Sequence, residues 1–295
     1  MRSRIIETIA VAGGDCTVAR WPGAGMPLLA VHGITASHCA WPGVVDAMVS
    51  RCAVLAPDLR GRGASAGLPP PYGLKVHVAD LLAVLDYHGV ADCVVAGHSL
   101  GAYIALELAA AAPARVRGLV LVDGGLALPL REGSTPEQVI QGVLESVLKR
   151  LEQHYADRAA AHRAWREHPA FQDAGAWNAI VEDYVDYDLA AATGGGLRSR
   201  TNPEAVRVDS YGPVDPAMPT LIDSIRVPML LLTAPRGILN QPKPLLPASL
   251  VDAKCARLPN LRHVEIPDTN HYSIILGSGA PAVAREIDRF LYDLS

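Results

Sequence analysis

The sequence has no marked excess of charge of either sign. Its 26 lysine and arginine residues are nearly balanced by 30 aspartate and glutamate residues, and charged residues make up 19% of the chain against 50% hydrophobic ones. This composition is not that of a disordered chain, and the arginines are scattered and form no basic patch. We therefore expect a folded protein that does not bind nucleic acid.

Sites built from cysteine are lacking as well. The chain has 5 cysteines, which are widely spaced and form no CxxC pair and no cysteine–histidine spacing typical of zinc: Cys16, Cys39, Cys52, Cys93 and Cys255. This pattern predicts no metal site, and it favours a reducing, cytoplasmic location.

Long hydrophobic runs are also absent. The stretch Leu100–Ala112 is interrupted by Glu107, is followed by Pro113, and is too short to cross the ~30 Å hydrocarbon core of a bilayer. Residues 5–11 and 16–21 flank a Gly-Gly-Asp turn, which is typical of a β-hairpin and not of a signal peptide. We expect a soluble protein without a membrane span.

Short apolar runs alternate with helix-length segments in the first part of the chain. The runs predict strands that are buried on both faces, and the segments between them predict helices, so the pattern indicates a parallel sheet covered on both sides. The expected strands are Leu28–Val31, Ala53–Ala56, Cys93–Ala96 and Leu119–Val122, and the expected helices are His38–Ser50, Lys75–His88 and Leu100–Ala112. The predicted fold class is α/β, with a doubly wound, mostly parallel sheet.

This alternation stops after Val122 and returns only at Val227–Thr233 and Val264–Ile266, before a closing helix. We predict a core of residues 1–125 and 226–295, with a mainly helical lid, residues 126–225, inserted after the sixth strand. Thr135 begins a Thr-Pro-Glu-Gln stretch, which is typical of a capping box at the start of a helix.

The pattern GxSxG occurs twice, around Ser65 and around Ser99. Catalysis requires this serine on a tight turn from a strand into a helix, where glycines tolerate the strained backbone. Ser99 lies between a predicted strand and a predicted helix, whereas Ser65 is followed by Leu-Pro-Pro-Pro, which cannot continue a helix. Ser99 is therefore the candidate nucleophile, and Ser65 is interpreted as a loop residue.

With this motif the chain resembles the α/β-hydrolase family over nearly its whole length except the insertion. The stretch His32-Gly33-Ile34-Thr35 resembles the family's oxyanion loop, which implies an oxyanion hole formed by the N–H groups of Ile34 and Leu100. The stretch that begins at Asp58 resembles a loop of the family in which the charged residues are expected to have a structural role.

The resemblance also implies a catalytic histidine in the loop after the last strand, where His271 lies. The acid is less clear, since the region after the seventh strand holds Asn240 but no carboxylate. Asp123 ends the sixth strand, where some lipase-like relatives carry the acid. We predict Ser99, His271 and Asp123 as the triad, although the order of these residues along the chain does not exclude another acid.

These residues predict hydrolysis of a small acyl substrate such as a carboxylic ester, thioester or lactone, without a cofactor or metal. Residues next to the motifs are predicted to contact the substrate: His32, Thr35, His98 and Tyr272. His32 has an alternative interpretation as a residue that braces its loop. Carbon–carbon bond hydrolysis or lyase chemistry on the same fold, and a non-catalytic binding role, remain alternatives. The oligomeric state is not predicted.

Overall fold

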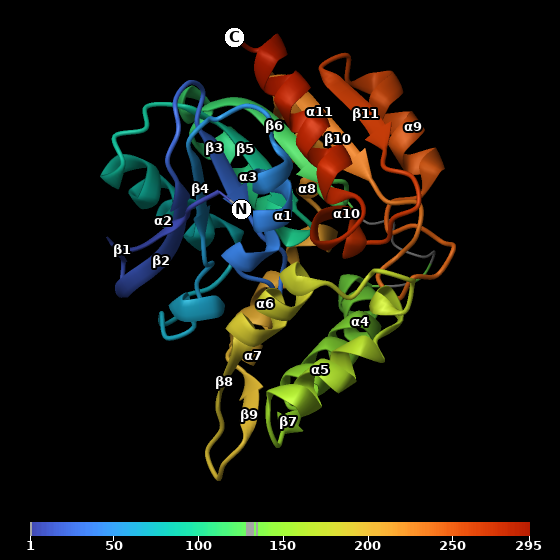
Figure 1. Cartoon of the computed structure of the whole chain (residues 1–295). Coiled ribbons are helices and arrows are strands. Elements are labelled where there is room, and N and C mark those ends of the chain that lie inside the picture. The colour runs from blue at the N-terminus through green and yellow to red at the C-terminus, as the bar shows by residue number, and fades with distance from the viewer. Residues whose placement is uncertain (1, 128–132, 134) are drawn as a thin grey trace.

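A sheet of 8 strands forms the centre of the computed structural model, which describes residues 2–127, 133 and 135–295 (Figure 1). The strand order is β1-β2-β4-β3-β5-β6-β10-β11. β1 pairs with β2 and β2 pairs with β4 in antiparallel orientation, and all the other neighbouring strands are parallel. The strands are β1 (Ile5–Val11), β2 (Gly14–Trp21), β3 (Leu28–Val31), β4 (Val54–Pro57), β5 (Cys93–His98), β6 (Val116–Val122), β10 (Met229–Thr233) and β11 (Leu261–Glu265). The predicted mostly parallel α/β sheet is confirmed.

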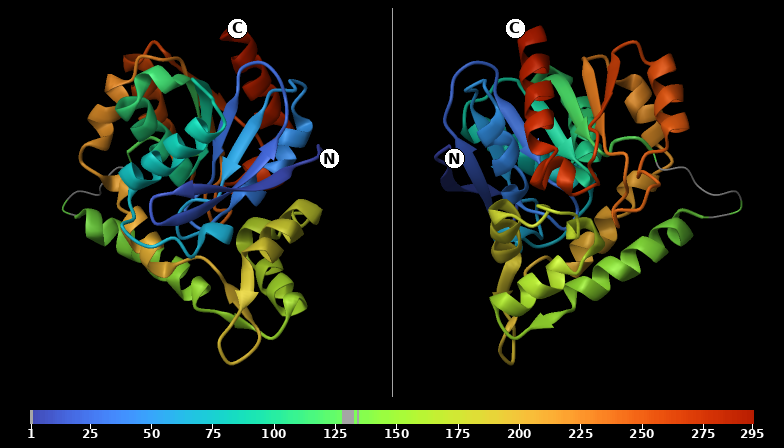
Figure 2. Two further views of the ribbon diagram at one scale, coloured as in Figure 1. Left: turned by 90° about the vertical axis from the view of Figure 1, so that its left-hand side faces the viewer. Right: turned by 45° about the vertical axis from the view of Figure 1, so that its right-hand side comes forward.

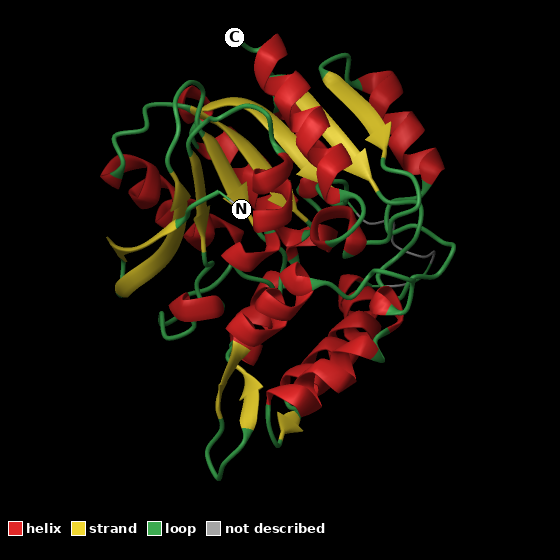
Figure 3. Ribbon diagram, in the orientation of Figure 1, coloured by secondary structure: helices red, strands yellow, loops and turns green. Residues whose placement is uncertain are grey.

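Helices cover both faces of this sheet (Figures 2 and 3), and its inner strands are therefore buried on both sides. The apolar core on one face includes residues of α2 (Leu74–Tyr87), α3 (Leu100–Ala111), α8 (Met218–Ser224) and α9 (Ala248–Arg257). The core on the other face includes residues of α1 (Pro42–Ala47), α10 (Ser273–Leu276) and α11 (Ala280–Asp293). The molecule is therefore doubly wound, as expected.

One helical prediction needs correction, and one helix was not predicted. The helix expected over His38–Ser50 is a 3₁₀ turn, His38–Ala40, followed by α1. Pro42 takes the first position of α1, where a proline lacking an N–H is tolerated, and this starts a new helix. Helix α9 was not anticipated from the sequence pattern.

Most of the described residues between β6 and β10 form a separate group of elements beyond the carboxyl ends of the central strands (Figures 1 and 2). It contains α4 (Pro136–Leu151), α5 (Arg158–Arg166), α6 (Ala179–Asp188) and α7 (Pro203–Asp209), and a small antiparallel sheet of β7 (His154–Tyr155), β9 (Leu197–Ser199) and β8 (Leu189–Ala191). The predicted capping box forms, since Thr135 and Gln138 bond each other's backbone N–H groups. We call this group, residues 135–217, the inserted segment.

The structure describes the end of the predicted lid but not all of its start. Residues 128–132 and 134, at its start, lie outside the described residues. Helix α8, near its end, packs against α3, and its Met218 and Ile222 belong to the apolar core. A lid role for residues 126–225 remains a prediction.

No helix in the described part of the chain combines the length and the apolar character that crossing a bilayer requires.

Candidate active site

Ser99 occupies a strained turn between β5 and α3. Its φ of 54° and ψ of −119° lie in a region that L-residues rarely adopt. Gly97 and Gly101 make the turn possible, because a Cβ on Gly97 would lie 2.1 Å from the Gly101 carbonyl oxygen and one on Gly101 would lie 2.2 Å from the Val31 carbonyl oxygen. The glycines of the motif are thus required by close backbone contacts, and Ser99 is held at the carboxyl edge of the sheet.

The pairing of β5 with β6 places Asp123 next to this turn. His98 is opposite Val122 in the parallel register, and the Ser99 N–H donates to the Val122 carbonyl at 2.9 Å. Asp123, the next residue, has a φ of 46° and is fully buried. Gly124 then passes so close to Ser99 that an added Cβ would lie 2.5 Å from the Ser99 carbonyl oxygen.

His271 joins the two side chains. It lies in the loop between β11 and α10, and its Nε2 is 3.0 Å from Ser99 Oγ while its Nδ1 is 2.6 Å from Asp123 Oδ2. The Nδ1–H donates to the carboxylate, which leaves Nε2 as the acceptor of the serine hydroxyl. The second carboxylate oxygen of Asp123 accepts from the Ala234 N–H at 3.2 Å. The structure thus brings the three predicted residues together in one hydrogen-bonded chain.

Asn240, the alternative partner for the histidine, lies elsewhere. Its Nδ2 donates to Asp173 and its Oδ1 accepts from Asn270 Nδ2 at 3.1 Å. Asn240 therefore supports the loop that carries His271 through Asn270 and makes no hydrogen bond to the imidazole.

The predicted oxyanion loop packs directly against the serine. A Cβ on Gly33 would lie 3.2 Å from Ser99 Cβ, which places the next residue, Ile34, beside the serine. The N–H of Leu100 is in the first turn of α3 and has no intrahelical acceptor. Within the described residues the Ile34 N–H also has no hydrogen bond, whereas the Ile34 carbonyl accepts from Arg62 Nε at 2.9 Å. Both N–H groups are available for a ligand oxygen.

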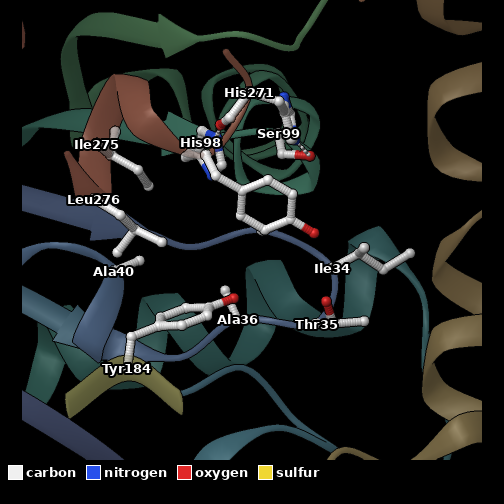
Figure 4. A pocket seen from close by; sticks show the side chains of 12 residues that line it. Ile34, Thr35, Ala36, Ala40, His98, Ser99, Tyr184, His271, Ile275 and Leu276 are labelled. Carbon is white, nitrogen blue, oxygen red and sulfur yellow. Dashed lines mark hydrogen bonds between the residues drawn. The ribbon is translucent and has the colours of Figure 1, made fainter. Parts of the chain in front are cut away.

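A small pocket of about 40 Å³ opens in front of Ser99 (Figure 4), with room for a few water molecules. Three of the four residues predicted to contact the substrate line this pocket: Thr35, His98 and Tyr272. The remaining lining residues are Gly33, Ile34, Ala36, Ala40, Ser99, Tyr184, His271, Ile275 and Leu276. Sequence reasoning did not single out Ala36, Ala40, Ile275 or Leu276, because small and aliphatic residues carry no motif.

His32 does not line the pocket. It is completely buried, its Nδ1 bonds the Gly33 carbonyl at 2.8 Å, and its Nε2 accepts from the Leu59 N–H at 2.9 Å. Burial lowers the pKa of His32 to about 4, so the ring is neutral at pH 7. Its predicted contact with substrate is wrong for this geometry, because both ring nitrogens brace loops, as the alternative interpretation held.

His98 supports the backbone of His271. Its Nε2–H donates to the His271 carbonyl at 2.9 Å, and the two rings are 4.7 Å apart. Burial, together with the neighbouring His271, holds the pKa of His98 well below its ordinary value. A neutral His98 fixes the position of the His271 backbone without adding a second positive charge.

The aromatic residues of the inserted segment mostly pack against one another. Trp165, Phe171 and Tyr184 are buried in the same apolar cluster as α10 and α11, and only Tyr184 among them reaches the pocket. Core packing therefore explains the presence of most of these aromatic side chains.

A mostly parallel sheet with a serine, a histidine and a carboxylate at its carboxyl edge is the arrangement typical of a class of hydrolases. The family model described as alpha/beta hydrolase fold matches residues 26–278. The chain belongs to the α/β-hydrolase family.

Several named proteins are similar to it in sequence. Lipase LipV of Mycobacterium tuberculosis is 32% identical over 59% of this chain and 60% of its own length. A putative carbamate hydrolase, RutD, of Azorhizobium caulinodans is 39% identical over 35% of this chain and 38% of its own length. A 2-hydroxymuconate semialdehyde hydrolase of a Pseudomonas strain is 35% identical over 42% of this chain and 45% of its own length. The matches thus span 60% or less of these relatives.

Solved structures match the whole chain at lower identity. E-2-(acetamidomethylene)succinate hydrolase has a TM-score of 0.78 at 21% identity, with 98% of this chain and 100% of that chain covered. A thioesterase domain from the curacin biosynthetic pathway has a TM-score of 0.73 at 22% identity, with 97% and 99% covered. These likenesses support the fold.

Proposed function

We propose that this protein is a serine hydrolase that cleaves a carboxylic ester, thioester or lactone through an acyl-enzyme on Ser99. The observation that carries this proposal is the hydrogen-bonded chain from Ser99 Oγ through His271 to Asp123. A serine hydroxyl is a weak nucleophile until a neighbouring base takes its proton, and this arrangement provides the base.

In the proposed reaction His271 Nε2 accepts the Ser99 proton as Oγ attacks the acyl carbonyl. The oxygen of the tetrahedral intermediate is stabilised by the N–H groups of Ile34 and Leu100, where each such donor is worth about 3 kcal/mol of the barrier. His271 then protonates the leaving group, and water repeats the sequence to release the acid. Asp123 holds the imidazole in the required tautomer and stabilises its cation. This route uses no cofactor or metal, and the inserted segment would act as a lid over the pocket.

The names of the relatives support acyl chemistry but cover more than one reaction. A lipase name and a carbamate hydrolase name agree with acyl transfer to water. The relative named 2-hydroxymuconate semialdehyde hydrolase makes carbon–carbon bond cleavage the second candidate. The cytoplasmic location expected from the cysteines remains a prediction.

The experiment compares Ser99→Ala with Ser65→Ala, the serine of the second GxSxG sequence. Turnover of 4-nitrophenyl butanoate and labelling by a fluorophosphonate probe are measured for both variants and the wild type. Ser99→Ala should lower turnover by at least about 10³-fold and abolish labelling, while Ser65→Ala should retain labelling. Undiminished ester cleavage by Ser99→Ala would refute the proposal.

A wild type that is labelled at Ser99 and yet hydrolyses no ester, thioester or lactone would instead favour the carbon–carbon bond hydrolase. That alternative is then tested directly by turnover of a vinylogous 1,5-diketone.

A further inference from the structure

Arg150 of the inserted segment reaches the wall of the active-site pocket. It lies in the last turn of α4, and its Nη2 donates to Thr35 Oγ1 at 3.0 Å. Thr35 lines the pocket together with Ser99, and the two side chains are on different sides of it (Figure 4). The permanent positive charge of Arg150 therefore lies next to the pocket. Its contact, Thr35, directly follows Ile34 of the proposed oxyanion hole.

This guanidinium has no carboxylate partner among the described residues. The two arginines that are buried in the core each have one, since Arg60 pairs with Asp80 and Arg62 pairs with Asp209. Arg150 instead lies over the ring of Trp165, with 4.7 Å from its guanidinium carbon to the ring centre. Stacking on an aromatic ring fixes the plane of a guanidinium without neutralising its charge.

The remaining N–H groups of Arg150 are not sealed in the interior. Its nitrogens are not among the buried nitrogens that lack a partner in the described part of the chain. Burial raises the pKa of the Asp188 carboxyl, and the charge of Arg150 opposes this rise. No hydrogen bond joins the two side chains, and Asp188 accepts from the Thr201 hydroxyl at 3.0 Å. The guanidinium thus keeps donors for an anion that enters from outside.

We propose that Arg150, positioned by Thr35 and Trp165, binds a carboxylate of the substrate, so that the enzyme prefers esters that carry a free carboxylate. This inference rests on the proposed ester hydrolysis at Ser99. A planar guanidinium offers two parallel N–H donors, which match the two oxygens of a carboxylate. A hydrogen bond of this charge-assisted kind is expected to change kcat/KM by about 10- to 100-fold.

The test compares anionic and neutral esters of matched size by acid release in a pH-stat. Monoethyl glutarate and ethyl pentanoate differ by a carboxylate on the acyl side, and carboxymethyl butanoate and propyl butanoate differ by one on the alcohol side. The wild type should prefer the anionic member of at least one pair, and Arg150→Gln should lower that preference by about 10- to 100-fold. The preference should also weaken as salt is raised.

Two further variants separate recognition from a merely structural role. Arg163→Gln, an exposed arginine on α5 of the same segment, should leave the preference unchanged. Arg150→Lys keeps the charge without the planar fork and should restore part of the preference. If Arg150→Gln only loosened α4, both members of a pair would slow equally and the ratio would not change.

The inference is overturned if the wild type prefers the neutral ester in both pairs, or if Arg150→Gln leaves the ratio unchanged. These outcomes are distinct from failure of the proposed function, in which no ester of either kind is hydrolysed and Ser99 resists the fluorophosphonate probe. In that case the inference falls together with the function on which it rests.

Discussion

Asp123 reaches His271 because of the backbone conformation at the end of β6. Its positive φ of 46° turns the chain immediately after the strand, and its carboxylate is fully buried between the His271 ring and the Ala234 N–H. A buried carboxylate needs such partners to offset its loss of hydration. This arrangement supports the proposed role of Asp123 as the triad acid, since its carboxylate is not bonded only to local backbone.

We predict that Asp123→Asn lowers kcat/KM for 4-nitrophenyl butanoate by about 10³- to 10⁴-fold, because an amide can impose the wrong tautomer and cannot stabilise the imidazolium. Asn240→Ala should lower it by less than about threefold, since Asn240 reaches the loop indirectly, through Asn270, and makes no hydrogen bond to the His271 ring. Steady-state kinetics of the two variants, with circular dichroism to verify folding, checks both expectations. A larger loss in Asn240→Ala than in Asp123→Asn would show that the acid is wrongly assigned.

Asp123 was predicted from its position at the end of the sixth strand. Asn240 remained an alternative partner for His271, because both residues lie between Ser99 and His271 in the chain. Hydrogen-bond geometry distinguishes them, and it depends on the pairing of β6 with β10, where the Asp123 N–H donates to the Leu232 carbonyl at 2.7 Å. Long-range pairing of this kind has no local signature in the sequence.

At the scale of elements, a buried charge cluster ties the inserted segment to the oxyanion loop. Arg62 donates to the Ile34 carbonyl and pairs with Asp209 of α7. Asp209 also accepts from His77 of α2 at 2.8 Å and from the Gly73 N–H at 2.8 Å. The side chains of Arg62, His77 and Asp209 are nearly inaccessible to solvent. Arg62 and Asp209 therefore compensate each other's charge, and hydrogen bonds connect this pair to α2 and to the loop after β3.

We predict that Asp209→Ala lowers the free energy of unfolding by about 3 to 5 kcal/mol, because it leaves Arg62 buried without its counter-charge. The variant should also turn over esters more slowly, since Arg62 positions the Ile34 carbonyl. Urea unfolding followed by circular dichroism measures the first effect and ester kinetics the second. Asp183→Ala, at an exposed position of α6, serves as the control and should change the unfolding free energy by no more than about 0.5 kcal/mol. Equal stability of the two variants would contradict this role for Asp209.

At the scale of the whole molecule, Asp58 connects the core to the inserted segment. Its Oδ1 accepts from His38 Nδ1 at 2.9 Å, and its Oδ2 accepts from the Ala64 N–H and from the Tyr187 hydroxyl of α6 at 2.7 Å. The expectation of a structural role for this charged loop agrees with these contacts. Burial is the largest single influence on His38 and opposes its protonation, but the hydrogen bonds and charges of Asp58 and Cys39 together outweigh burial and raise the pKa of His38 to about 9.

This pKa predicts how stability depends on pH. A histidine whose pKa rises on folding stabilises the folded state fully below its unfolded pKa of about 6.5, and the contribution is lost as pH increases through the folded value. The stability advantage of the wild type over His38→Gln should therefore be largest near pH 6 and shrink as the pH rises through 9. Urea midpoints measured between pH 6 and pH 10 test this. His154→Gln, an exposed histidine of β7, is the control and should match the wild type at every pH. A gap between His38→Gln and wild type that stays constant over this range would refute the prediction.

Local pattern was sufficient for much of this protein. The apolar runs of β3 and β5 have their predicted starts, the GxSxG sequence around Ser99 forms the predicted turn, and Thr135 caps α4. Each depends on interactions within a few residues, such as backbone sterics at glycine or a side chain that bonds a nearby N–H. The sequence by itself thus determined the fold class and the identity of the candidate nucleophile.

Only the tertiary structure decided which distant groups meet. It brought His271 to Asp123 and Ser99, turned His32 away from the pocket, and placed Arg150 against Thr35. These contacts join residues far apart in the chain, and they arise from the order of strands in the sheet and from the packing of the inserted segment. Periodicity and motifs report local conformation and burial, whereas the partner of a buried charge is set by the packing of the whole chain.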